Sequence, residues 1–218
     1  MMKKIFCING SPRKNGSTAE LLAEAARGAE KAGAESQIIH LADIPNDGCH
    51  SCFACKSRRG KYRGRCGWKD DMQLILDKLI NSDGIILGTP VYFGRESGLM
   101  YCFEERLFYP ALRYAEGFPS QAVKKIPLGF IYTMNASADA MKERGYIDTL
   151  AISQGYGERL FGYKPLVLYS NDTLQFTDYE KYDVDAFSLP HKLKVREEQF
   201  PLDKKAAEEM GERIAKTE

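Results

Sequence analysis

Residues 5–18 constrain the fold of this chain more than any other stretch. They read IFCINGSPRKNGST, which is a short apolar run, a break at Gly10, a loop of small, polar and basic residues, and a helix start at Ser17. A helix N-terminus leaves backbone N–H groups without partners and carries a partial positive charge, so it favours a bound phosphate. The stretch therefore predicts a strand, an anion-binding loop and a helix.

The composition of this loop indicates a terminal monophosphate. Gly10 and Gly16 allow close approach of the backbone, but no lysine follows Gly16, as a nucleoside-triphosphate loop would require. The dinucleotide fingerprint G-x-G-x-x-G is also absent, since residues 155–160 lack the third glycine. Ser17 and Glu20 have the spacing of a capping box, which predicts that the helix begins there. An ordinary strand-to-helix turn remains the alternative.

Composition and charge describe a balanced globular chain. The 218 residues are enough for one domain, predicted to span 1–218, and 44% of them are hydrophobic. A net charge of +1 gives no reason to expect nucleic acid or an anionic membrane as partner. The first apolar run is too short for a signal peptide and no later run is long enough to span a bilayer, so we expect a cytoplasmic protein.

Strand and helix patterns alternate five times along the chain. This order predicts the α/β class, with a doubly wound, five-stranded parallel sheet in a single domain. The predicted strands are 5–9, 37–41, 84–88, 127–133 and 165–169. Ligands bind such sheets outside the carboxyl ends of the strands, where the loops after the first, third and fourth strands meet. Residues 171–201 have no clear period and are expected to form an irregular excursion over the surface.

Four motifs, taken as an ordered set, resemble a known family. They are residues 10–18, the cysteines within 49–66, Asp70-Asp71-Met72, and Gly88-Thr89-Pro90-Val91-Tyr92-Phe93-Gly94. The set resembles the flavodoxin-like NAD(P)H-dependent FMN reductases and is most similar to their iron-sulfur flavoprotein branch. The motifs lie in the first half of the chain; beyond about residue 135 the resemblance is one of fold only.

The resemblance implies a flavodoxin-like fold with FMN bound at the sheet edge. The implied phosphate site comprises Ser11, Arg13, Asn15, Gly16, Ser17 and Thr18. The implied border of the isoalloxazine ring comprises Thr89, Pro90, Val91, Tyr92, Phe93 and Gly94. Thr133 and Asn135 join the expected site from their position after the fourth strand. The aromatic pair suits a flat ring, although core packing is the alternative for both residues.

The implied reaction is hydride transfer from NAD(P)H to bound FMN and then to an acceptor such as a flavin or quinone. It needs no acid, base or nucleophile from the protein, so no catalytic residue is expected. Because the chain lacks a dinucleotide fingerprint, NAD(P)H is expected to bind transiently and to give ping-pong kinetics.

Cys49, Cys52, Cys55 and Cys66 have the spacing C-x2-C-x2-C-x10-C. Structural disulfides are not expected for a cytosolic chain. The resemblance implies a four-iron (4Fe-4S) cluster on these thiolates, although the last interval is longer than the compact spacing of the family. Free thiols without metal and a zinc site are the two alternatives. The other two cysteines, Cys7 and Cys102, are predicted to be buried structural thiols.

Six cations lie between the third and fourth clustered cysteines, at Lys56, Arg58, Arg59, Lys61, Arg63 and Arg65. They could offset the charge of a cluster, dock an acidic electron carrier, or hold the 2′-phosphate of NADPH. A solvated loop is the simpler interpretation.

Two further functions remain open from the sequence. One is an iron-sulfur flavoprotein electron carrier that takes electrons from a ferredoxin-like partner, and the other is a flavodoxin-like binding module without flavin. The aromatic residues Phe108, Tyr109 and Tyr114 indicate subunit contacts, and the resemblance implies a homodimer or homotetramer.

Overall fold

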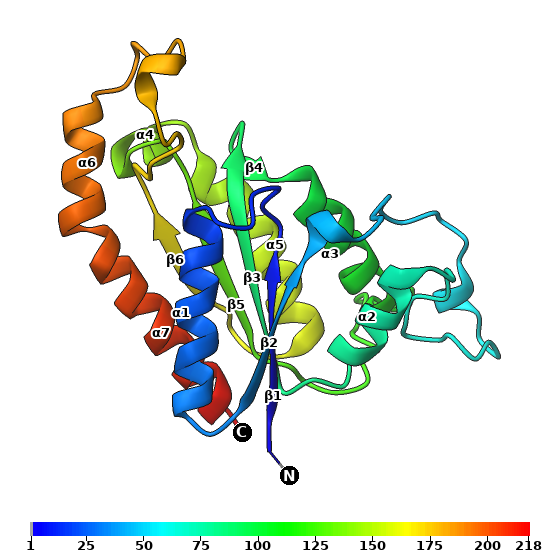
Figure 1. Cartoon of the computed structure of the whole chain (residues 1–218). Helices are drawn as coiled ribbons and strands as arrows, with labels where there is room; N and C mark the ends of the chain where they lie inside the picture. The colour runs from blue at the N-terminus through cyan, green and yellow to red at the C-terminus, as the bar shows by residue number, and fades with distance from the viewer. Residues whose placement is uncertain (1) are drawn as a thin grey trace.

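Five parallel strands form the centre of the computed structural model, which describes residues 2–218 (Figure 1). In sheet order they are β2 (Glu35–His40), β1 (Lys4–Asn9), β3 (Gly84–Tyr92), β5 (Leu128–Thr133) and β6 (Leu166–Ser170). A two-residue strand, β4 (Arg95–Glu96), returns antiparallel against the end of β3. The predicted α/β class with a doubly wound, five-stranded parallel sheet is confirmed.

Helices cover both faces of this sheet. They are α1 (Ser17–Lys31), α2 (Asp71–Leu79), α3 (Gly98–Ala111), α4 (Ala138–Glu143), α5 (Tyr146–Phe161), α6 (Leu189–Glu198) and α7 (Phe200–Lys216). Because side chains alternate along a strand, Ile5 and Cys7 of β1 pack with α1 and α7, whereas Phe6 and Ile8 pack with α2, α3 and α5. Figure 1 shows α1 and the red α7 side by side on one face of the sheet.

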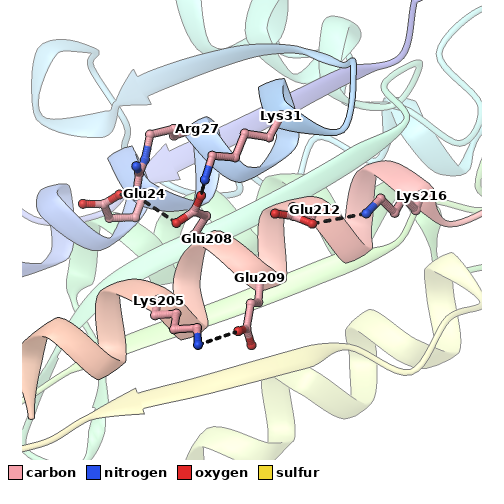
Figure 2. Close-up of polar contacts among 8 residues, drawn as sticks. All are labelled: Glu24, Arg27, Lys31, Lys205, Glu208, Glu209, Glu212 and Lys216. Atoms are coloured by element: carbon pink, nitrogen blue, oxygen red, sulfur yellow. Dashed lines mark hydrogen bonds and ion pairs between the residues drawn. The ribbon is translucent and has the colours of Figure 1, made fainter.

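Two glycines allow α1 and α7 to pack backbone against backbone. A Cβ atom on Gly28 would lie 1.9 Å from the carbonyl oxygen of Glu208, and one on Gly211 would lie 1.8 Å from that of Ala25. At the rim of this contact Glu208 accepts from Arg27 at 2.9 Å and also pairs with Lys31, as Figure 2 shows. The close contact requires glycine at both positions, whereas the exposed ion pairs contribute little.

The structure corrects two local predictions. Helix α1 does begin at Ser17, but Gly16 is its N-cap and no side chain caps it, so the predicted Ser17–Glu20 capping box is wrong. Residues 171–201 are not irregular throughout, because they contain the short turn η3 (Tyr179–Lys181), all of α6 and the first residues of α7. Within residues 2–218 no helix is both long and apolar enough to cross a bilayer.

Candidate cofactor site

The loop after β1 is held tightly at the carboxyl edge of the sheet. The Gly10 N–H donates to the carbonyl of Gly88 at 2.8 Å, and the Ser97 hydroxyl donates to the Gly10 carbonyl at 2.6 Å. A Cβ atom on Gly10 would lie 2.8 Å from the Cβ of Met100, so a larger residue would displace the loop from α3. These contacts join the first loop to the end of β3 and the start of α3.

The same loop folds back on itself before α1 begins. The N–H of Ser11 donates to the side chain of Asn9 at 2.9 Å, and the N–H of Arg13 donates to the Ser11 hydroxyl at 3.1 Å. Gly16 then enters α1 in an extended conformation and provides no side-chain cap. The first N–H groups of α1 are therefore left for an external acceptor, and the positive end of the helix dipole favours an anion there.

The loop after β5 lies against the start of α1. The hydroxyls of Thr18 and Thr133 form a buried hydrogen bond of 2.7 Å. The backbone carbonyl of Asn135 accepts from Lys192 of α6 at 2.6 Å, but the side-chain Oδ1 of Asn135 is buried without a partner. A buried carbonyl oxygen of this kind calls for a donor, which a ligand in the adjoining cavity can supply.

The end of β3 turns sharply into β4. Phe93 at the tip has a left-handed backbone with φ of 53° and is fully exposed, whereas Tyr92 beside it is 45% exposed. Gly94 also has a left-handed backbone, and a Cβ atom there would lie 2.7 Å from the ring of Tyr146. The turn therefore leaves Tyr92 beside the first loop and directs Phe93 into solvent.

These loops enclose a cavity of about 540 Å³. Its lining consists of Ser11, Pro12, Arg13, Gly16, Ser17, Thr18, Pro90, Val91, Tyr92, Thr133, Met134, Asn135, Thr173, Leu174, Gln175, Phe176, Thr177 and Tyr182. Ten of the fourteen residues expected at the site from the sequence are in this lining. The other four lie outside it: Asn15 is exposed, the hydroxyl of Thr89 bonds to Ser97, and Phe93 and Gly94 form the turn.

Sequence reasoning missed one wall of the cavity, formed by residues 173–182. Phe176 stacks on Tyr182 with ring centroids 4.2 Å apart, and the hydroxyl of Tyr179 accepts from the N–H of Gln175 at 3.1 Å. The side chain of Arg13 donates to the carbonyl of Gln175, which ties this wall to the first loop. The only sequence signal was the number of aromatic residues in a segment that lacks any strand or helix period.

Two buried carboxyl groups lie behind the β3–β4 turn. Glu96 accepts from the Tyr132 hydroxyl at 3.4 Å, and Glu104 accepts from the Ser153 hydroxyl at 2.8 Å while its other oxygen has no partner. Burial raises the pKa of both carboxyls, and the neighbouring Glu96 raises the pKa of Glu104 further. Neither residue lines the cofactor cavity, so the pair is not part of the cofactor site.

The segment 49–66, which carries the four clustered cysteines, lies on the side of the molecule away from α1 and α7 (Figure 1). Cys49 and Cys52 are exposed, Cys55 is buried, and the sulfur of Cys66 lies 3.5 Å from Arg106. Burial raises the pKa of the Cys55 thiol, with smaller contributions from the three other thiols against an opposing effect of Lys56. Within residues 2–218 no three His, Cys, Asp or Glu side chains are grouped so that they could hold a metal ion. The thiols as arranged do not form a cluster site.

The remaining cysteines differ in their surroundings. Cys7 is fully buried in β1, and burial raises the pKa of its thiol to about 12, as the prediction of a structural thiol requires. Cys102 of α3 is only partly buried. His40 bonds the side chain of Asn9 at 2.9 Å.

Comparison with known proteins places the chain in a family. Residues 3–142 match the model of the NADPH-dependent FMN reductase family. The chain belongs to this family. It is 40% identical over 97 residues to an iron-sulfur flavoprotein of Archaeoglobus fulgidus, a match that covers 44% of this chain and 45% of the relative. It is also 40% identical over 103 residues to an iron-sulfur flavoprotein of Methanocaldococcus jannaschii, covering 47% and 51%. The matches thus span about half the length of these relatives.

Solved structures support the fold over nearly the whole chain. The NAD(P)H:quinone oxidoreductase from Methanothermobacter marburgensis superposes with a TM-score of 0.71 at 12% identity, covering 98% of this chain and 100% of that one. An FMN-dependent NADH-azoreductase from Bacillus anthracis, solved with FMN, gives a TM-score of 0.66 at 11% identity, covering 98% and 100%. At such identities the likeness shows a flavodoxin-like fold.

Proposed function

We propose that this protein is an FMN-dependent NAD(P)H oxidoreductase that passes electrons to an acceptor such as a flavin or quinone. The observation that carries the proposal is the cavity of about 540 Å³ into which segments from distant parts of the sequence converge. It lies at the carboxyl edge of a parallel sheet, where this architecture binds its ligands. Family membership supports the same conclusion.

The residues of the first loop fit the phosphate of FMN. The uncapped start of α1 offers backbone N–H groups, and the hydroxyls of Ser17 and Thr18 line the same end of the cavity. The guanidinium of Arg13 adds a positive charge beside them. Together these groups would hold a phosphate dianion by charge-assisted hydrogen bonds.

The other end of the cavity fits a flat ring. Pro90, Val91 and Tyr92 form one border, and Asn135 lines the same cavity. When bound, FMN supplies the redox chemistry by taking a hydride, that is two electrons and a proton, from the nicotinamide of NAD(P)H. The role of these side chains is to orient the ring and to leave one face open.

The test begins with the affinity for FMN, measured by quenching of flavin fluorescence. Arg13→Ala should weaken FMN binding at least about tenfold, since it removes a charge-assisted contact worth roughly 1.5–3 kcal/mol. Lys14→Ala is the matched control, because Lys14 does not line the cavity and pairs with Asp43 at 2.6 Å. Equal losses in the two variants would contradict the assigned phosphate site.

The activity is then measured under anaerobic conditions. Excess NADPH or NADH should bleach the flavin bands of the FMN-loaded protein, and added quinone or free flavin should restore them. Initial rates at several acceptor concentrations should give the parallel double-reciprocal lines of ping-pong turnover. Flavin that binds but is not reduced by either nucleotide would refute the oxidoreductase function.

The names of the relatives favour a second candidate, an iron-sulfur flavoprotein electron carrier with a ferredoxin-like donor. It would require Cys49, Cys52, Cys55 and Cys66 to move together to hold a four-iron cluster. Iron and acid-labile sulfide in anaerobically purified protein, near four of each per chain, would support it. Flavin without iron or sulfide would favour the reductase. Size-exclusion chromatography with light scattering would test the predicted homodimer or homotetramer.

A further inference from the structure

A second recess of about 480 Å³ lies beside the cysteine segment, and its lining is cationic. It is formed by Lys56, Arg58, Arg63, Arg113, Tyr114 and Gln121, which we call the basic pocket. Four of the six residues are positively charged at neutral pH and none is acidic. The chain as a whole is close to neutral, so this gathering of one sign of charge is local.

Three of the four cations have no internal counter-ion. Arg58, Arg63 and Arg113 are exposed, and their side chains make no ion pair or hydrogen bond with any residue of the described chain, 2–218. Some guanidinium groups elsewhere are paired, as Arg196 is with both carboxylate oxygens of Glu20 at 2.8 Å. Three unpaired guanidiniums around one recess repel each other, and a bound anion would relieve that repulsion.

Lys56 is fixed at the bottom of the basic pocket. Its ammonium donates to the carbonyls of Tyr109 and Leu112 at the end of α3, and it lies 4.1 Å from the ring centroid of Tyr109 and 5.1 Å from that of Tyr114. An ammonium has three N–H donors, so one remains for a ligand. The carbonyls and rings hold the charge in place without neutralising it.

The basic pocket is separate from the cofactor cavity. Ser97, which caps the first turn of α3, contacts the cofactor loop at Gly10, whereas the basic pocket lies at the opposite end of the same helix. The fourteen residues of α3 at 1.5 Å per residue place the two ends roughly 20 Å apart. No residue lines both cavities. A ligand in the basic pocket is therefore not the phosphate of the bound FMN.

We propose that the basic pocket binds a small molecule carrying two or more phosphate-type negative charges. Each guanidinium of Arg58, Arg63 and Arg113 is planar and can donate two hydrogen bonds to a pair of phosphate oxygens. A ligand with a single point charge would not match this geometry. Lys56 is recessed. The basic pocket therefore suits a ligand that is small enough to enter it better than it suits a flat acidic surface. The exposed ring of Tyr114 gives such a ligand an apolar contact at the rim.

Isothermal titration of inorganic pyrophosphate into FMN-saturated protein tests this proposal, because the phosphate loop is then occupied. We expect one site per chain and at least about tenfold weaker binding, or about 1.4 kcal/mol, in R58A/R63A/R113A. The control R59A/K142A/R144A removes three exposed cations that do not line the basic pocket and should change the affinity less than about twofold. Circular dichroism and FMN affinity verify that both triple variants are folded.

Three results would overturn the proposal. One is absence of pyrophosphate binding at low ionic strength, and another is equal loss in the two triple variants. The third is binding of a glutamate decapeptide, abolished in R58A/R63A/R113A, without binding of pyrophosphate, which would make the basic pocket a docking surface for an acidic protein. FMN is bound in every sample of this titration. If the FMN-loaded protein has no NAD(P)H activity, the proposed function is refuted and this inference is unaffected.

Discussion

Substitution of Glu104 by glutamine should make the protein more stable at neutral pH and change how its stability depends on pH. Glu104 is 3% exposed, one carboxylate oxygen accepts from Ser153, and the other has no partner. Burial first, and the charge of Glu96 second, raise its pKa well above the ordinary value of 4.5. Glutamine keeps the shape and the Ser153 contact but never acquires a charge.

The sign of the effect follows from proton linkage. Since the pKa of Glu104 is higher in the folded state, its contribution to stability is complete below pH 4.5 and is lost as pH rises toward the folded pKa. One such group lowers the free energy of unfolding by about 1.4 kcal/mol per pH unit in that range. The loss builds up at this rate between the unfolded and the folded pKa and is constant above the folded pKa.

Urea denaturation of FMN-saturated protein at pH 4.5, 5.5 and 6.5 measures this loss. We expect E104Q and wild type to be similar at the lowest pH and E104Q to be more stable at the highest. The stability of E104Q should still fall somewhat as pH rises, because burial also raises the pKa of Glu96. The exposed Glu158 of α5 provides the control E158Q, which should follow wild type. If the stability of E104Q and of wild type changed identically with pH, a protonated, buried Glu104 would be refuted.

Two further substitutions test packing and pairing, each by the midpoint of thermal unfolding. Gly211→Ala should destabilise the protein by about 1–3 kcal/mol, because the added Cβ would lie 1.8 Å from the Ala25 carbonyl oxygen. An unchanged midpoint would contradict the close α1–α7 contact. Asp70→Asn should lower the free energy of unfolding by about 3 kcal/mol, since the buried Arg106 loses the carboxylate it bonds at 2.6 Å. Asp71 is exposed, so Asp71→Asn should have little effect. Equal effects at the two aspartates would refute the pairing.

The sequence was sufficient for the sheet and for the first loop because both depend on local patterns. Continuous apolar runs mark strands that are buried on both faces, and glycines mark the close approach of a loop to its neighbours. Asp70 is the N-cap of α2, and its side chain accepts from the N–H of Gln73 at 2.9 Å. Asp70 also pairs with Arg106, which lies 36 positions further along the chain, and no local sequence pattern predicts this pairing.

Helix α6 shows why the second half of the chain was harder to predict. Lys192 is its only buried residue, and this lysine donates to the carbonyl of Asn135 and the carboxylate of Asp172. A helix that is held by a buried cation has no apolar stripe, so hydrophobic periodicity does not reveal it. The prediction of irregular structure was therefore wrong over 189–198, although α6 does lie on the surface.

These polar contacts give the second half of the chain a direct part in forming the cofactor cavity. Lys192 fixes the backbone at Asn135, which lines the cavity, and Arg196 bonds Glu20 in the first turn of α1. Ser170 at the end of β6 is bonded to the buried Asp203 of α7. The segment 173–182 runs between these anchors and closes the cavity over the first loop. The motifs of the first half thus supply ligand-binding groups, and polar contacts from residues without a motif complete the cavity around them.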